Sequence, residues 1–207
     1  MERKTSQTRR KAVWGTRSAL GIAAGMALLT PGCSEAIRTG QSPAYLIMNS
    51  LQGAPGTAGA FSSTLSSDVV NVDPATGNQS IAPDRGQALL ELAMKDPLAA
   101  PSTANSITIT QYHVEYIRSD GRNTQGVDVP FAFDGGVTVT ISGAATVPFT
   151  LVRVQAKQEA PLKALAFGGG ANTITTIARV TFYGHDQNGR DVSVTGNIEV
   201  NFSDWAG

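Results

Sequence analysis

The chain has 207 residues, with 16 Lys and Arg against 16 Asp and Glu, two His and one Cys, and 41% of its residues are hydrophobic. This length suits one domain or two small ones. Such a high apolar fraction excludes a wholly disordered chain, and a single cysteine excludes both a disulfide framework and a cysteine-based zinc cluster. Composition alone therefore indicates a folded domain but names no activity.

The first 32 residues are typical of a secretory signal peptide. Residues 1–17 contain six basic residues and one acidic residue, and an uncharged apolar run from Ala19 to Leu29 follows. A basic region followed by about eleven apolar residues is the pattern of an export signal. The run is shorter than the roughly 20 residues that a membrane helix needs. We therefore expect residues 1–32 to be removed on export.

The apolar run ends in Leu-Thr-Pro-Gly-Cys, which places Cys33 directly after a small residue. This segment resembles the lipobox of bacterial lipoproteins, with Thr30 at a position where most of them have an aliphatic residue. The resemblance implies that the Cys33 thiol receives a diacylglyceryl group, that the chain is cut before Cys33, and that the new N-terminus is acylated as well. Two or more acyl chains anchor a protein stably, because each buried methylene contributes about 0.8 kcal/mol.

The location within the envelope follows from the same resemblance. Ser34 after the cysteine favours the outer membrane, on its periplasmic or its surface face. The alternative is a soluble secreted or periplasmic protein that is cut after Ala36, which would leave Cys33 in the discarded peptide.

The leader also contains Thr8-Arg9-Arg10-Lys11, which is similar to the twin-arginine export signal. Such signals are addresses that a receptor reads, not anchors. The general secretory route and the twin-arginine route both stay open on the sequence, and the second would export the domain already folded.

Removal of the leader changes the charge of the protein. The leader takes six basic residues and one acidic residue, which leaves a chain of 175 residues with ten basic and fifteen acidic residues and a net charge of −5. The remaining Lys and Arg are dispersed, so no basic stripe matches a nucleic-acid backbone, and we expect no nucleic-acid partner. The expected partners are the membrane, through the lipid, and an unknown envelope protein or polysaccharide.

Residues 33–43 are predicted to be a flexible tether, and residues 44–207 a single β domain. Apolar patterning predicts strands over Ala44–Leu51 and Leu65–Val72, and a long loop over 73–86 that is rich in Pro, Gly and Asp. The segment Gln87–Lys95 is ambiguous, because its residues are good helix formers yet its apolar residues alternate as in a half-buried strand. The strands predicted on both sides favour a strand.

The second half of the domain has the stronger strand patterns. Ile107–Ile117 is rich in β-branched and aromatic residues, and a shift of its apolar phase after Ile109 predicts a bulge. Further strands are predicted over Val137–Ile141 and Val147–Val154. The alternation lapses over 155–170, which predicts a turn or two of helix or a crossover between sheets.

The clearest pattern is a hairpin near the end of the chain. Ile174–Tyr183 and Val192–Phe202 flank a turn that contains Asn188-Gly189, the strongest short signal for a hairpin. In the last strand, apolar and polar residues alternate, with Gly196 in the inward phase. The patterns together predict an all-β, antiparallel, immunoglobulin-like β-sandwich of about seven to nine strands. This architecture resembles the immunoglobulin-like or fibronectin-type modules of bacterial surface proteins.

Two acid-rich loops are the candidate ligand or ion sites. The hairpin turn clusters Asp and Asn oxygens around a glycine, as calcium loops do, but lacks the Glu that an EF-hand requires. An ordinary hairpin turn explains the same residues. The other loop, from Asp120 to Asp134, fits either a sugar or ion site at one end of the sandwich or a set of acids exposed to solvent. The candidate residues are Asp120, Asp128, Asp134, Asp186, Asn188 and Asp191.

Signals for catalysis are weak. His113 and His185 belong to no zinc-binding pattern, and the sequence has no nucleophile elbow, phosphate-binding loop or dinucleotide fingerprint. We therefore assign no catalytic residue, no metal site and no cofactor beyond the lipid on Cys33. A hydrolase that uses two carboxylates stays open, since it needs only two acids brought together by the fold.

The aromatic residues are further candidates for a binding site, because exposed rings stack on sugars and anchor protein interfaces. Most are expected in the core, but Trp205 follows the last strand and is expected to be partly exposed. Three functions remain: a non-enzymatic envelope lipoprotein with a structural or protein-interaction module, which we favour; a carbohydrate- or calcium-binding module; and a carboxylate-based hydrolase. The candidate aromatic residues are Tyr45, Tyr112, Tyr116, Tyr183 and Trp205.

Overall fold

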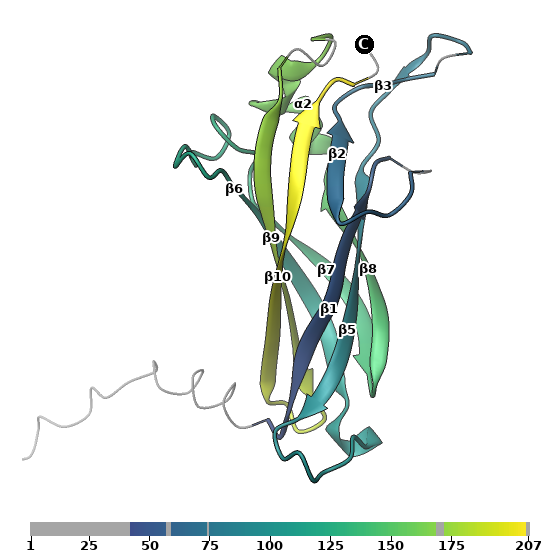
Figure 1. Cartoon of the computed structure of the whole chain (residues 1–207), viewed down its shortest axis with the longest axis vertical. Helices are drawn as coiled ribbons and strands as arrows, with labels where there is room; N and C mark the ends of the chain where they lie inside the picture. The colour runs from purple at the N-terminus through teal and green to yellow at the C-terminus, as the bar shows by residue number, and fades with distance from the viewer. Residues whose placement is uncertain (1–41, 57–58, 74, 169–171, 206–207) are drawn as a thin grey trace, which may run out of the picture. The chain divides into compact units, whose positions relative to one another are not determined.

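The computed structural model describes residues 42–56, 59–73, 75–168 and 172–205. The predicted leader, Cys33 and nearly all of the predicted tether lie outside these residues. The described part of the chain is mostly β, with ten strands in three sheets and three short helical segments (Figure 1). No helix in this part is both long and apolar enough to span a membrane.

A three-stranded antiparallel sheet has the order β1-β5-β8. Its strands are β1 (Ala44–Ala54), β5 (Asp84–Met94) and β8 (Ala144–Val152). Strand β5 contains nearly all of the ambiguous Gln87–Lys95 segment, so the strand prediction is confirmed. Its alternate residues Ala88 and Leu90 are fully buried, because one face of this strand packs on the core.

A five-stranded sheet has the order β2-β10-β9-β6-β7. Its strands are β2 (Thr64–Asp68), β10 (Asp191–Ser203), β9 (Ile174–Asp186), β6 (Ile107–Ile117) and β7 (Phe133–Ile141). All neighbours are antiparallel except β2, which runs parallel to β10 from Thr64↔Glu199 to Asp68↔Ser203. The prediction of a wholly antiparallel fold is therefore wrong at this pair, because β2 is joined to β1 of the other sheet and not to β10 by a hairpin.

The predicted strand Leu65–Val72 is interrupted. After β2 the chain turns at Val69, whose N–H donates to the Ser203 carbonyl (2.9 Å), and a two-stranded ribbon follows. This ribbon pairs β3 (Asn71–Val72) with β4 (Gln79–Ser80). The predicted loop 73–86 thus contains β4 and the start of β5.

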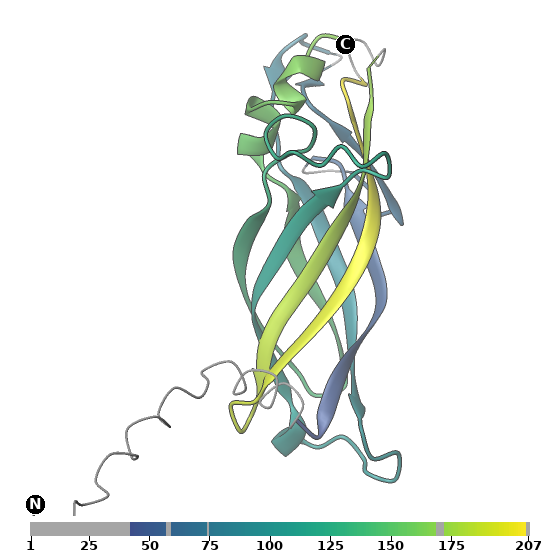
Figure 2. The ribbon, with the colours of Figure 1, turned by 90° about the vertical axis from the view of Figure 1, so that its left-hand side faces the viewer.

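Side chains from both large sheets share one core. The rings of Tyr112 and Phe182 in the five-stranded sheet pack with the ring of Phe149 in the three-stranded sheet, with centroids 5.3 to 6.2 Å apart. The Tyr116 hydroxyl donates to the Leu151 carbonyl (2.7 Å) and so links the sheets by a buried hydrogen bond. Figure 2 shows the strong twist of the strands around this core.

Three local predictions are confirmed. The register of β6 shifts between Ile109 and Gln111, which is the predicted bulge. Gly189 has φ +73° in the predicted hairpin turn, a conformation that favours glycine. Gly196 faces inward, where a Cβ would lie 2.1 Å from the Met48 sulfur, so only glycine fits at this position without rearrangement.

The segment after β8 crosses to the other sheet through two helical turns, as predicted for 155–170. These are α2 (Val154–Gln158) and η2 (Leu162–Leu165), and a third short helix, η1 (Thr103–Asn105), precedes β6. Leu162 and Leu165 bury their side chains and fix the crossover to the core. This packing places the side chain of Lys157 inside the domain.

Candidate functional site

A buried ion pair lies where α2 meets the start of β5. The Lys157 ammonium is 2.9 Å from Asp84 Oδ1, and neither side chain has exposed surface. Lys157 Nζ also donates to the Asp68 carbonyl (2.7 Å). The Asp84 carboxylate accepts two further hydrogen bonds, from the Gly56 N–H (2.8 Å) and from the Ser67 hydroxyl (2.5 Å). The pair thus joins the crossover, β5, β2 and the end of β1.

The hydrogen bonds explain how two charges persist in the core. Removal of a charge from water costs several kcal/mol, and mutual attraction offsets this cost only when the remaining donors and acceptors are also satisfied. Sequence reasoning missed this pair, because Asp84 fell in a predicted loop and Lys157 in a predicted crossover. No spacing pattern connects two residues that are 73 positions apart.

The chain end is fixed next to this pair. The Trp205 N–H donates to Asp68 Oδ1 (3.2 Å) where the parallel strands β2 and β10 end. Asp204 is buried, and its Oδ2 accepts a hydrogen bond from the Phe167 N–H. The side chain of Trp205 is 49% exposed, which confirms the expected partial exposure.

A groove of about 930 Å³ opens beside Trp205, and we call it the Trp205 groove. Its volume is within the range of about 300–1,000 Å³ that is usual for ligand sites. Two carboxylates, Asp68 and Asp73, line it, and none of the described lining residues is basic. The lining residues are Pro55, Gly56, Gly59, Ser66, Asp68, Asn71, Val72, Asp73, Ser80, Ala82 and Trp205.

The polar groups of the Trp205 groove differ in how many hydrogen-bond partners they have and in how their pKa values are shifted. Burial raises the pKa of Asp68, and the nearby charge of Asp204 raises it further, although the Trp205 N–H and Lys157 act in the opposite direction. The pKa of Asp73 is lowered by hydrogen bonds from its own turn, above all from the Thr76 hydroxyl. The amide nitrogen of Asn71 is buried without a hydrogen-bond partner.

A second hollow of about 570 Å³ adjoins the first at Ser80, and we call it the Phe167 groove. Its lining includes Val70, Ile81 and Phe167, and the last of these is 69% exposed. Phe167 has φ +63°, a conformation that residues with side chains rarely adopt. The bond from its N–H to buried Asp204 holds it there.

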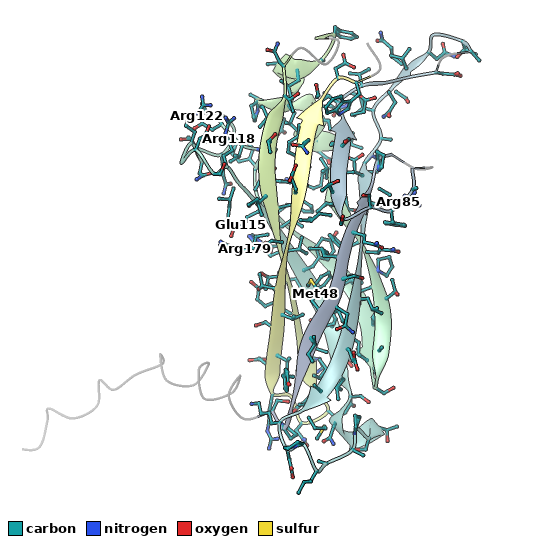
Figure 3. All side chains as sticks on the ribbon, in the orientation of Figure 1. Met48, Arg85, Glu115, Arg118, Arg122 and Arg179 are labelled. Atoms are coloured by element: carbon teal, nitrogen blue, oxygen red, sulfur yellow. The ribbon has the colours of Figure 1, made fainter. Side chains whose placement is uncertain are left out.

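The loop after β6 pairs its own acids. The Asp120 carboxylate binds the guanidinium groups of Arg118 (2.7 Å) and Arg122 (2.9 Å), which hold the pKa of Asp120 well below its usual range. Figure 3 shows both arginines on this loop. Asp128 accepts the Thr124 N–H (3.2 Å) and closes a local turn.

The remaining candidates are also bound close to their own positions. Asp134, on β7, is 2.8 Å from Nδ1 of its neighbour His113 on β6. Asp186 is buried, and its Oδ1 accepts the N–H groups of Asn188 and Arg190 (2.9 Å each). Burial raises the pKa of Asp186, but these hydrogen bonds, with help from Ser42 and Arg190, bring the pKa below its usual value.

The two predicted loops lie at opposite ends of β6. Asp186 pairs with Ile107 at the start of this strand, whereas Asp120 follows its end at Ile117. Eleven residues of strand span roughly 35 Å at about 3.3 Å per residue. Asp191 lies in the same hairpin as Asp186, opposite His185 in the ladder. The structure therefore separates the two predicted loops and binds the acids of each loop to partners of their own.

Across the residues that the structure describes, no three His, Cys, Asp or Glu side chains are grouped as a metal site would require. The Trp205 groove was not predicted from the sequence, although Trp205 itself was singled out. Comparison with known proteins gives no further assignment, because no protein-family model and no curated protein matches this chain.

Proposed function

We propose that this chain is a non-enzymatic lipoprotein of the bacterial envelope, held by lipid on Cys33, most consistent with the outer membrane, and that its β domain is an immunoglobulin-like interaction module. The leader and the lipobox-like segment support the anchor. The observation that carries the interaction role is the pair of adjoining grooves with the half-exposed ring of Trp205 at one and the exposed ring of Phe167 at the other. Exposed aromatic side chains beside a hollow are typical of binding surfaces.

Binding is favoured over catalysis because the acids near the grooves already have partners. Asp84 is fully hydrogen-bonded inside the core. Asp73 accepts from the Thr76 hydroxyl with one oxygen and from the Ala75 N–H with the other. Asp68 accepts the Trp205 N–H. These bonds hold the groove in shape, and Trp205 is the exposed aromatic residue among the described residues that line it.

The anchor is tested by detergent phase partition and N-terminal mass spectrometry of the full chain made in a bacterium. Wild type is expected in the detergent phase with a lipid-bearing N-terminus at Cys33, and Cys33→Ser in the aqueous phase. Ser34→Ala is the matched control and should partition like wild type. A Cys33→Ser protein that stays in the detergent phase, or a wild-type chain that begins beyond residue 33, would contradict the anchor.

A second candidate, a carboxylate-based hydrolase, is supported by one observation. Asp68 and Asp73 line the same groove, with a raised pKa for the first and a lowered pKa for the second. Opposed shifts in two carboxyl groups are the pattern of an acid and a base in glycosidases. Release of reducing ends from an oligosaccharide by wild type, lost in Asp68→Asn, would favour this candidate over the first.

A further inference from the structure

We propose that the Trp205 groove binds a neutral carbohydrate, with the Trp205 indole as the stacking surface and with Asp68 and Asn71 as hydrogen-bonding groups. The inference rests on the proposed interaction role and names the class of ligand that the module would take. It assigns the ligand to the strand ends near the chain terminus, not to either of the acid-rich loops.

The backbone that carries the Trp205 ring is fixed, although the residue is half exposed. Its backbone N–H is bound to Asp68, and the preceding residue, Asp204, is buried and bound by the Phe167 N–H. Trp205 lines the groove, and its fixed backbone reduces the freedom that the residue loses when a ligand covers the indole. A flat aromatic face with a polar edge suits a sugar ring, which has an apolar face bordered by hydroxyl groups.

The polar lining suits groups that both donate and accept hydrogen bonds. The buried amide nitrogen of Asn71 has no acceptor, and a buried donor without a partner is unfavourable. Asn71 lines the groove, so a rotation of its side chain would bring this nitrogen to a sugar hydroxyl oxygen as its acceptor. The carboxylate of Asp68 and the hydroxyl groups of Ser66 and Ser80 line the same groove and can accept hydroxyl protons.

The charge of the lining argues against other small ligands. Among the described residues that line it, the groove has the carboxylates of Asp68 and Asp73 and no basic side chain, and the guanidinium of nearby Arg85 is bound to the Gly56 and Gly59 carbonyls, so phosphate groups and acidic sugars are disfavoured. A calcium ion would need several free oxygens, but both carboxylate oxygens of Asp73 are used in its own turn. An uncharged polyhydroxyl ligand avoids both conflicts.

Tryptophan fluorescence tests the proposal. The chain has two tryptophans, Trp14 and Trp205, so Trp14→Phe leaves Trp205 as the sole reporter whether or not the leader is cleaved. Detergent-solubilised full-length protein is titrated with chitotetraose, cellotetraose and maltotetraose, and separately with glucose 6-phosphate and calcium chloride. A saturable change in Trp205 emission is expected with at least one neutral oligosaccharide, and none with the phosphorylated sugar or with calcium.

Calorimetry with the oligosaccharide that binds then compares variants. Trp205→Ala is expected to weaken binding at least tenfold, and Asn71→Ala several-fold. Tyr45→Ala removes an aromatic residue of similar exposure (43%) that lines neither groove and is the matched control, with affinity unchanged. The urea midpoint of each variant is measured alongside, so that loss of affinity in a protein as stable as wild type reports the site.

Three results would overturn the proposal: no binding of any neutral oligosaccharide at millimolar concentration, undiminished binding by Trp205→Ala, or equal binding of glucose 6-phosphate. None of these depends on the anchor, because detergent partition of Cys33→Ser is measured independently. Failure of sugar binding with a confirmed lipid at Cys33 therefore removes the ligand class and leaves the envelope location intact. Sugar binding by a protein that carries no lipid at Cys33 would instead contradict the envelope location and leave the ligand class intact.

Discussion

The acidic residues of the two predicted loops differ from those at the end of β2 and the start of β5 in how far along the chain their partners lie. In the loops, Asp120 binds side chains two residues away, and Asp186 binds N–H groups two and four residues away. At the strand ends, Asp84 binds groups 28 and 73 residues away, and Asp68 binds the N–H of a residue 137 positions away. Short-range pairs shape turns, whereas long-range pairs hold distant segments together around a groove.

This contrast also separates the two regions in energy. Exposed ion pairs contribute little, because water and salt screen them and the side chains lose freedom. A buried charge that loses its partner is costly, because it stays away from water without compensation. Loss of the exposed Asp120 pairs and loss of the buried Asp84–Lys157 pair should therefore differ in their effect on stability, and substitutions of Asp186 and Asp68 should differ in the direction of their pH dependence.

The largest effect is expected from Lys157→Met, which leaves the Asp84 carboxylate buried without a counter-charge. Loss of one partner of a buried pair typically costs about 3–5 kcal/mol in the free energy of unfolding. Urea denaturation measures this loss in the free energy of unfolding. Lys163→Met, at an exposed lysine of the same crossover, is the matched control and should change stability by less than about 0.5 kcal/mol. A Lys157→Met loss no larger than that of the control would mean that the pair does not hold the strand ends.

Asp186→Ala is expected to have the next largest effect, about 2 kcal/mol, because two backbone N–H groups lose a charged acceptor. The pKa of Asp186 is lowered in the folded protein, so its contribution is present above the unfolded value of 3.8 and is lost as pH falls through the folded value. The difference in urea midpoint between wild type and variant should therefore shrink on acidification below pH 4. A difference that grows there would contradict the assigned role.

Asp68→Asn should show the opposite dependence. Its raised pKa means that the folded state holds the proton more tightly, so wild type gains stability at this site as pH falls from 7 toward 3.8. Asparagine keeps an acceptor for the Trp205 N–H but has no charge to bury. The variant is expected at or slightly above the wild-type urea midpoint at pH 7, with the gap closing near pH 4. A variant whose urea midpoint falls further below that of wild type as pH rises would contradict the expected difference between Asp68 and Asp186.

The smallest effect is expected from Asp120→Ala. Its carboxylate and both arginine partners lie on an exposed loop, where the lost pairing is replaced by water. Thermal unfolding should give the same midpoint as wild type within error, at low and at high salt. A loss comparable to that of Lys157→Met would show that this loop supports the fold as the buried pair at the strand ends does.

The sequence predicted the features that depend on neighbouring residues. Alternation in Gln87–Lys95, together with the strands predicted on both sides, identified β5, the phase shift after Ile109 located the bulge, and Asn188-Gly189 located the hairpin turn. Each depends on side-chain periodicity or backbone conformation within a few positions. These are the properties that a local pattern records.

The features that depend on distant residues were not predictable in this way. The parallel pairing of β2 with β10 and the Asp84–Lys157 pair join segments that share no pattern. Charged residues were assigned to exposed loops, because burial of a charge depends on partners supplied by the fold. The position of Trp205 after the last strand predicted its partial exposure, but no sequence pattern predicted that Asp68 and Asn71 line the same groove.

The parallel pair has a consequence for biosynthesis. Strand β10 lies between β2 and β9, so the five-stranded sheet is incomplete until residues 191–203 have been made. Contacts that close such a long stretch of chain form late, because their entropy cost precedes the gain from pairing. The nascent chain therefore carries an incomplete five-stranded sheet until β10 has been made, and the export that we propose would meet the chain in that unfinished state.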